Sequence, residues 1–170
     1  MIAPTAEALW QYSLRLYSDP TVSAACLELQ DECGADVNML FALLFAASRG
    51  LLLSHSEVSG LDRECEGWRE SVIEPLRRVR RLIKNDELRA HCDVYQQVKK
   101  AELLAERRHQ FALAAALERI VAATRTSSPH DAARLNLQAY LPLQNARSDR
   151  LAILLRAYAR DLSLTGNPPT

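Results

Sequence analysis

The stretch DPTVSAACLELQDECGADVNMLFALLFAASRG, residues 19–50, decides the fold of this 170-residue chain. It contains two segments with helical spacing, and the second includes nine consecutive apolar residues, Met39 to Ala47. A helix that is apolar on every side must be surrounded by other elements. We therefore predict an all-α, single-domain bundle over residues 1–170, in which six to seven helices surround a buried central helix from Asp36 to Arg49.

The signals at the ends of these two helices are strong. Asp19 can cap a helix whose first residue is Pro20, because proline has no N–H to leave unpaired there. Gly34 can adopt the left-handed conformation that ends a helix, and Asp36 can cap the next one. The central helix would have 14 residues, whereas a membrane span needs about 20. The stretch therefore predicts the core of a globular protein, and we expect no membrane partner.

The composition is that of an ordinary globular protein. Apolar residues make up 48% of the chain and charged residues 25%. Because 21 Asp and Glu balance 21 Lys and Arg, we expect no general attraction to nucleic acid or to an anionic membrane. The first residues, MIAPTAEALW, lack the basic and apolar regions of a secretory signal. We therefore expect a cytoplasmic protein.

The four cysteines, Cys26, Cys33, Cys65 and Cys92, predict neither a disulfide framework nor a zinc site, because no C-x-x-C pair occurs. Three of them lie in apolar helical segments, where a free thiol behaves as a small hydrophobic group. We expect all four to be reduced.

Helical periodicity continues on both sides of the central stretch, without a strand or hairpin signal. A first helix, from Thr5 to Tyr17, places on one face Ala6, Trp10, Leu14 and Tyr17. A fourth helix should run from about Leu61 to Lys84 after a cap at Ser59. Proline in a helix removes a hydrogen bond, so we expect a bend between Ser71 and Pro75.

The second half of the chain should contain the longest helix, from Asp86 to about Ala123. The residues that define its apolar face are Val94, Val98, Ala101, Ala105 and Ala112. The sequence Ser128-Pro129 predicts another helix start, and this helix should end or bend at Pro142. A last helix should begin at Ser148, and residues 161–170 should form a frayed tail.

Three segments together resemble a known family: LQDECGADVNML (29–40), WRESVIEPLRRVRRLIK (68–84) and VKKAELLAERR (98–108). They are similar to short proteobacterial proteins that form the domain of unknown function 2390. The resemblance covers roughly residues 8–120. It implies a small all-helical protein and implies no activity, cofactor or site residue. The segment FALLFAASRG (41–50) differs from the family pattern, which has a second tryptophan at the end of the central helix.

A basic cluster is the first candidate binding site. Arg77, Arg81 and Lys84 share one stripe of the predicted fourth helix, within a segment that also contains Arg78 and Arg80. Such a stripe can hold a phosphate or an acidic partner. The alternative is a solvated face whose cations stabilise the negative end of the helix dipole.

A polar cluster on the long helix is the second candidate, because His91, Glu102 and His109 point the same way at about 100° per residue. Glu106 and His109 have the spacing of a carboxylate–histidine metal pair, but a di-iron site in a helical bundle needs this pair twice. We therefore expect no metal and no cofactor. The alternative is a buried polar cluster satisfied by Arg69, Arg77 or Asn38. In that case Glu102 should contact an arginine of the preceding helix, with candidates Arg69, Arg77 and Arg81.

No complete catalytic arrangement is present in the sequence. The acidic group Asp62, Glu64 and Glu66 is typical of a helix start, where carboxylates favour the positive end of the dipole. Our leading hypothesis is a non-enzymatic interaction or regulatory protein with an unknown protein partner, which could be a second copy of the chain. The alternative is an anion-binding or small-molecule-binding protein, or an enzyme, that uses the Arg77–Lys84 face together with His91, Glu102 and His109.

Overall fold

The computed structural model describes residues 4–85, 93–121, 128–141 and 148–165. The regular elements in these ranges are all helices, and the all-α prediction is confirmed. They are α1 (Pro4–Tyr17), α2 (Pro20–Cys33), α3 (Val37–Ser48), α4 (His55–Trp68), a π-helical turn (Arg69–Ile73), α5 (Glu74–Lys84), α6 (Asp93–Val121), α7 (Pro129–Tyr140) and α8 (Ser148–Thr165). Because α4, the π-helical turn and α5 follow one another without a break, they form a single long rod.

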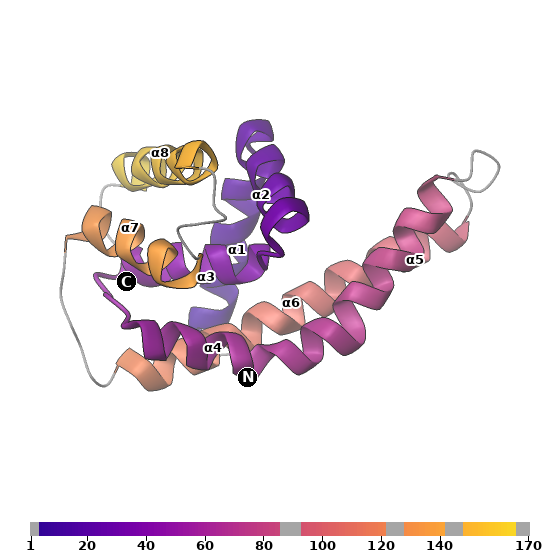
Figure 1. The fold of residues 1–170 in the computed structure, drawn as a ribbon, viewed down its shortest axis with the longest axis horizontal. Coiled ribbons are helices and arrows are strands. Elements are labelled where there is room, and N and C mark those ends of the chain that lie inside the picture. The colour runs from indigo at the N-terminus through magenta and orange to yellow at the C-terminus, as the bar shows by residue number, and fades with distance from the viewer. Residues whose placement is uncertain (1–3, 86–92, 122–127, 142–147, 166–170) are drawn as a thin grey trace.

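Helix α3 lies at the centre of the body, as the sequence predicted (Figure 1). All twelve of its residues are buried, and Leu40 and Leu44 are fully enclosed. Its cap is Asp36, whose carboxylate accepts a hydrogen bond from the Asn38 N–H at 2.9 Å. Helices α1, α2, α6 and α7 pack around α3. The central helix is therefore the element on which the body is assembled.

Most of the predicted helix ends are confirmed. The Asp19 carboxylate accepts a hydrogen bond from the Thr21 N–H at the start of α2, and Gly34 ends α2 with a φ of 66°. Ser128 caps α7, which ends at Tyr140, shortly before Pro142. Helix α8 continues to Thr165, so the expected frayed tail does not begin at residue 161.

The predicted start of the fourth helix is wrong. Ser54, rather than Ser59, is the cap: its hydroxyl accepts a hydrogen bond from the Glu57 N–H. The Glu57 carboxylate in turn accepts a hydrogen bond from the Ser54 N–H at 2.6 Å. Glutamate is long enough to reach back to the cap backbone, so this capping box satisfies two N–H groups instead of one.

The segment in which a bend was predicted, Ser71 to Pro75, overlaps a π-helical turn, Arg69–Ile73, and the chain stays helical through it. The N–H of Glu74 bonds to the Arg69 carbonyl, five residues back. Proline cannot donate to the carbonyl four residues before it, which here is Ser71. A wider turn directly before Pro75 lets the rod continue into α5.

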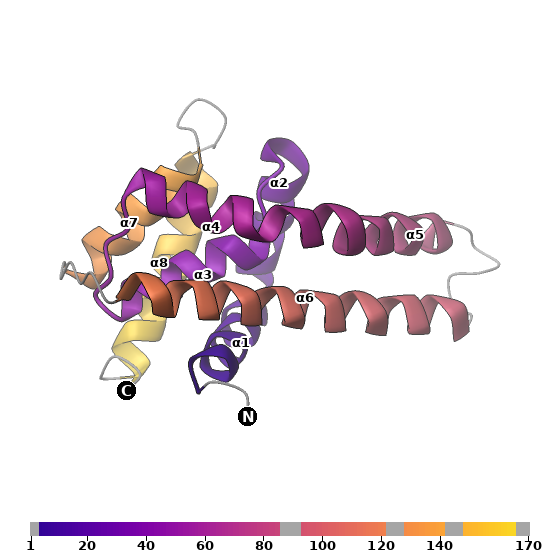
Figure 2. The same ribbon diagram turned by 90° about the horizontal axis from the view of Figure 1, so that it is seen from below.

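Helix α5 and the first half of α6 extend beyond the body as an antiparallel pair (Figures 1 and 2). We call this pair, residues 74–85 and 93–106, the arm. No residue of α5 is buried. The predicted bundle is therefore correct for the body, but the projection of the arm is a feature that helical periodicity does not reveal.

The predicted apolar face of the long helix is wrong in the arm. Val94 and Ala101 of the arm are exposed, and only Ala105 is buried as expected. Ala112, further along α6 in the body, is also exposed. The buried positions of α6 are Glu102, Ala105, His109, Gln110, Leu113, Ala114, Ala116 and Leu117. The first half of α6 lies outside the body, so its apolar side chains find little surface to pack against.

The predicted face of the first helix is also only half correct. Ala6 and Trp10 are buried, whereas Leu14 and Tyr17 are 43% and 40% exposed. Leu14 and Tyr17 lie near the root of the arm, where they help to line a groove.

A buried asparagine of α7 forms hydrogen bonds with the backbone of α3 and of the connection between α3 and α4. The Asn136 amide donates hydrogen bonds to the carbonyls of Leu43 and Leu51 and accepts one from the Leu53 N–H at 2.8 Å. Asn136 has no exposed surface, so these bonds satisfy backbone groups that would otherwise be buried without partners. Within the described ranges, no helix is long and apolar enough to cross a membrane.

Candidate functional site

The predicted basic stripe does not remain one surface in the structure. Arg77 turns toward α6, and only 11% of its side chain is exposed. Arg81 instead pairs with Asp31 of α2 at 2.9 Å, and both of these side chains are more than half exposed. Lys84 is exposed near the end of α5. The three residues predicted to act together therefore have three different surroundings.

Glu102 contacts arginines of the preceding helix, as expected. Arg80 donates to both of its carboxylate oxygens, one of them at 3.1 Å from Nη2. The Nε of Arg77 lies 3.6 Å from Glu102 Oε1. The pairing with Arg77 is confirmed, while Arg80, three residues further along α5, is a partner that we did not name.

Glu106 completes this ion-pair cluster at the root of the arm. Its Oε1 accepts a hydrogen bond from Arg77 Nη2 at 2.8 Å. Burial raises the pKa of Glu106, and the charge of Arg77 offsets only part of that increase. The hydrogen bond to Glu102 raises the pKa of the Arg80 guanidinium. Two arginines from α5 and two glutamates from α6 therefore join the helices of the arm where it meets the body.

His109 belongs to a second polar network inside the body. Its Nε2 lies 2.6 Å from Asp36 Oδ2, and both side chains are about 1% exposed. Arg69 Nη1 approaches the same oxygen at 3.4 Å and donates to Asp62 at 2.7 Å. The Asp36 N–H donates to the Tyr140 hydroxyl at 2.9 Å. Asp36, which we predicted only as a helix cap, therefore links the start of α3 to the π-helical turn, α6 and α7.

The charge state of Asp36 follows from its partners. Burial by itself would raise its pKa, but the hydrogen bond and charge of His109, the charge of Arg69 and the Asn38 N–H outweigh burial. The pKa of Asp36 is therefore lowered. An ionised Asp36 can only accept hydrogen bonds. The Nε2–H group of His109 therefore donates a hydrogen bond to the Asp36 carboxylate.

The predicted polar cluster is thus two separate networks. Glu102 faces Arg77 and Arg80 in the arm, whereas His109 faces Asp36 in the body. His91 lies outside the described residues. Among the residues that are described, no three His, Cys, Asp or Glu side chains could hold a metal ion together.

A groove lies at the root of the arm, between α1, α2 and α3 of the body and the two helices of the arm; we call it the root groove. Its volume is about 380 Å³. Its apolar walls include Leu14, Tyr17, Leu27, Phe41 and Leu103, and all of these except Phe41 are at least 40% exposed. Its polar lining includes Arg77, Arg80, Lys99, Glu102, Glu106 and Gln110, together with Ser13, Gln30 and Asn38. An apolar hollow with a few convergent polar groups is the usual form of a small-molecule site.

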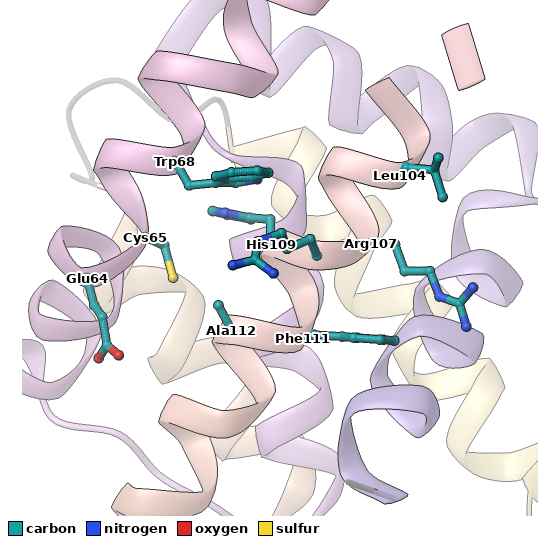
Figure 3. Close-up of a pocket in the computed structure, with 9 residues that line it drawn as sticks. Glu64, Cys65, Trp68, Leu104, Arg107, His109, Phe111 and Ala112 are labelled. Atoms are coloured by element: carbon teal, nitrogen blue, oxygen red, sulfur yellow. The ribbon is translucent and has the colours of Figure 1, made fainter. Parts of the chain in front are cut away.

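A second hollow of about 580 Å³ lies over the outer face of α6 (Figure 3). Cys65 and Trp68 of α4 line one side, and Phe111 and Ala112 of α6 are among the residues facing them. Arg108 lies over the Trp68 ring, 5.1 Å from its centre. This cation is therefore already held by an aromatic ring.

The outer hollow also brings together Cys65 and His109, which is hydrogen-bonded to Asp36. A cysteine nucleophile requires a thiolate. Burial, with a smaller contribution from nearby carboxylates, instead raises the pKa of Cys65 to about 11. The thiol is therefore protonated near neutral pH, and this arrangement does not support nucleophilic chemistry.

The root groove is the stronger candidate site, and sequence analysis identified only part of it. Arg77 and Glu102 were predicted, while Arg80, Lys99 and Gln110 were not. Helical spacing could have identified Lys99, because it is eleven residues before Gln110 and within about 20° of it on the helix. The walls from α1 and α2 depend on how those helices pack, which periodicity does not specify.

The fold and the groove define an all-α protein in which a two-helix arm projects from a body built around one buried helix. The family model described as "Protein of unknown function (DUF2390)" matches residues 8–113, and the chain belongs to this family. The matched region contains every residue that lines the root groove. No curated protein and no solved structure matches the chain.

Proposed function

We propose that the protein is a non-enzymatic, cytoplasmic interaction protein that binds a protein partner through the arm. One observation carries this proposal: five of the ten large apolar side chains that are exposed in the described ranges lie on the arm, namely Val79, Leu82, Val94, Leu103 and Leu104. Exposed apolar side chains gathered on one element mark an interaction surface. The free thiols of Cys26 and Cys65 suit the reducing conditions of the cytoplasm.

The charge of the arm indicates the chemistry of the partner. Its described residues include seven basic and four acidic side chains, a net charge of +3. In the described part of the chain, Arg78, Lys84, Lys99 and Lys100 form no ion pair, and all four are exposed. We infer that the partner presents an acidic surface with apolar side chains, such as an amphipathic helix. A second arm is disfavoured as the partner because two arms carry the same charge.

Photo-crosslinking in the source cell tests this proposal. A benzoylphenylalanine at position 82 or 104 replaces an exposed leucine of the arm, and one at Leu164 of α8, which is 86% exposed, is the control. We expect discrete adducts at both arm positions, and weaker adducts when Arg78→Glu and Lys100→Glu reverse the charge of the surface. Arm positions that react no more than position 164 would contradict the proposal. An adduct with a second copy would show a homodimer instead of an acidic partner.

A further inference from the structure

The root groove contains a buried polar atom that lacks a partner. Gln110 is 2% exposed, and its Nε2 donates to Asn38 Oδ1 at 2.9 Å. Its Oε1 has no hydrogen-bond partner within the described part of the chain. A buried carbonyl oxygen is costly when it is left unpaired. Because Gln110 lines the groove, an occupant with an N–H or O–H group would satisfy this oxygen.

The charged residues of the groove favour an anionic group on the occupant, at the end of the groove that lies away from Gln110. Arg77, Arg80 and Lys99 outnumber Glu102 and Glu106 in the lining. The two arginines are held by the two glutamates. Lys99 is exposed and forms no ion pair within the described ranges. One positive charge is therefore left over, at the rim.

The distance between these two groups limits the length of the occupant. Lys99 and Gln110 lie eleven residues apart on α6, which is about 16 Å along the helix axis. They point to the same side, within about 20°. Leu103 of the same helix lies between them and supplies apolar surface. Glu102 and Glu106 also line this stretch, where they are paired with arginines of α5. The volume of about 380 Å³ lies at the lower end of the range of small-molecule sites.

We propose that the root groove binds a small amphipathic organic acid. The carboxylate lies at Lys99 and Arg80, the apolar body contacts Leu14, Tyr17, Leu27 and Leu103, and a hydroxyl or amide N–H at the far end donates to Gln110 Oε1. The site overlaps the partner surface proposed for the arm at Leu103 and Lys99, and the ligand would contact the body and the arm at once.

Calorimetric titration of the full chain tests this proposal with three compounds that share one twelve-carbon tail: 12-hydroxydodecanoate, dodecanoate and dodecyltrimethylammonium. We expect 12-hydroxydodecanoate to bind about fivefold more tightly than dodecanoate, since it adds one neutral hydrogen bond. The cation should bind more weakly than either acid. Equal affinity for dodecanoate and the cation, or no binding of either acid, overturns the proposal. Equal affinity for the two acids overturns the role of Gln110.

Variants at adjacent positions supply matched controls. Lys99→Gln should weaken the binding of both acids about fivefold through loss of one exposed charge contact, whereas Lys100→Gln, which does not line the groove, should not. An unchanged affinity in Lys99→Gln overturns the proposal. Because Lys99 is exposed, this variant should fold normally.

A second pair of variants distinguishes the groove from the partner surface. Leu103→Glu places a negative charge in the wall and should abolish acid binding, while Leu104→Glu should leave it unchanged. Leu104 belongs to the exposed apolar set of the arm but not to the groove. If Leu104→Glu prevents crosslinking to a partner and retains acid binding, the two sites are distinct. A loss of acid binding in both variants contradicts the assignment to the root groove.

Discussion

In the body, α3 buries all twelve of its side chains, whereas in the arm α5 buries none. The difference is not one of helix formation, because both segments form regular helices. In the body, apolar side chains from several helices enclose one another. In the arm, a cluster of two arginines and two glutamates joins two helices that are otherwise largely solvated.

This contrast shows that the contacts that stabilise the fold lie mainly in the body, whereas the exposed apolar residues and the groove lie on the arm and at its root. Burial of apolar surface is the dominant favourable contribution to folding, so the body determines the global stability. Partly exposed ion pairs contribute less, and regions with few buried contacts open more readily. The arm can therefore carry exposed apolar residues and a groove at its root without weakening the core.

The largest expected effect is in the polar network of the body. Asp36→Ala removes the carboxylate that faces His109 and Arg69 and also the cap of α3. We expect a loss of about 3–5 kcal/mol in the free energy of unfolding, because breaking a buried charged network strands its remaining members. Urea denaturation measures this loss. A loss below about 1 kcal/mol would mean that the network does not help to hold the body together.

The core of α3 should be almost as sensitive. Leu44→Ala should lower the free energy of unfolding by about 2–5 kcal/mol through lost burial and a residual cavity. The matched control is Leu104→Ala on the arm, where the side chain is 66% exposed, and the change should stay within about 0.5 kcal/mol. Denaturation of both variants under the same conditions compares the two regions directly. Similar losses would remove the distinction between body and arm.

The ion pairs of the arm should have a smaller effect. Glu102→Ala should cost roughly 2–3 kcal/mol, which is less than for a fully enclosed pair, because Arg80 is partly exposed. Double-mutant cycles should show a coupling free energy between Glu102 and each of its two partners, Arg80 and Arg77. The control is Arg81, which pairs with Asp31 instead, and its coupling with Glu102 should be below about 0.5 kcal/mol. Coupling below that value for all three arginines would contradict the structural role of Glu102.

The smallest expected effect is on pH dependence, where the two regions differ in sign. The lowered pKa of Asp36 means that the body gains stability above the pKa of an unfolded aspartate, about 3.9, and loses it as the pH falls through the folded pKa. The raised pKa of Glu106 has the opposite effect: stability is lost as the pH rises from about 4.3 through the folded pKa.

Denaturation from pH 3 to pH 7 measures both contributions. Asp36→Asn should remove the acid-side loss, and Glu106→Gln should remove the loss at higher pH. Each variant is the control for the other, since it leaves the second carboxyl unchanged. The comparison between body and arm would be incorrect if the two variants changed the pH profile in the same direction.

Some features of the site could be predicted from particular residues. The pairing of Glu102 with an arginine of α5 followed from the cost of burying an unpaired carboxylate. The partner of His109 could not be predicted in this way, since Asp36 is far from it in the chain and was accounted for as a cap. Gln110 lacked any signal of its own, because a buried glutamine is common on long helices. Lys99 could be placed only through its helical spacing from Gln110.

The sequence by itself determined the helices, most of their caps and the buried centre, because helical periodicity and capping depend on residues within one or two turns. Only the tertiary structure decided that α5 and the first half of α6 leave the body together, and that α1 and α2 form the other wall of the groove. Periodicity identifies which side of a helix is apolar, but whether that side is buried depends on the neighbouring helices. Leu14 and Tyr17 illustrate this: their spacing predicts a buried face, yet both remain exposed in the groove.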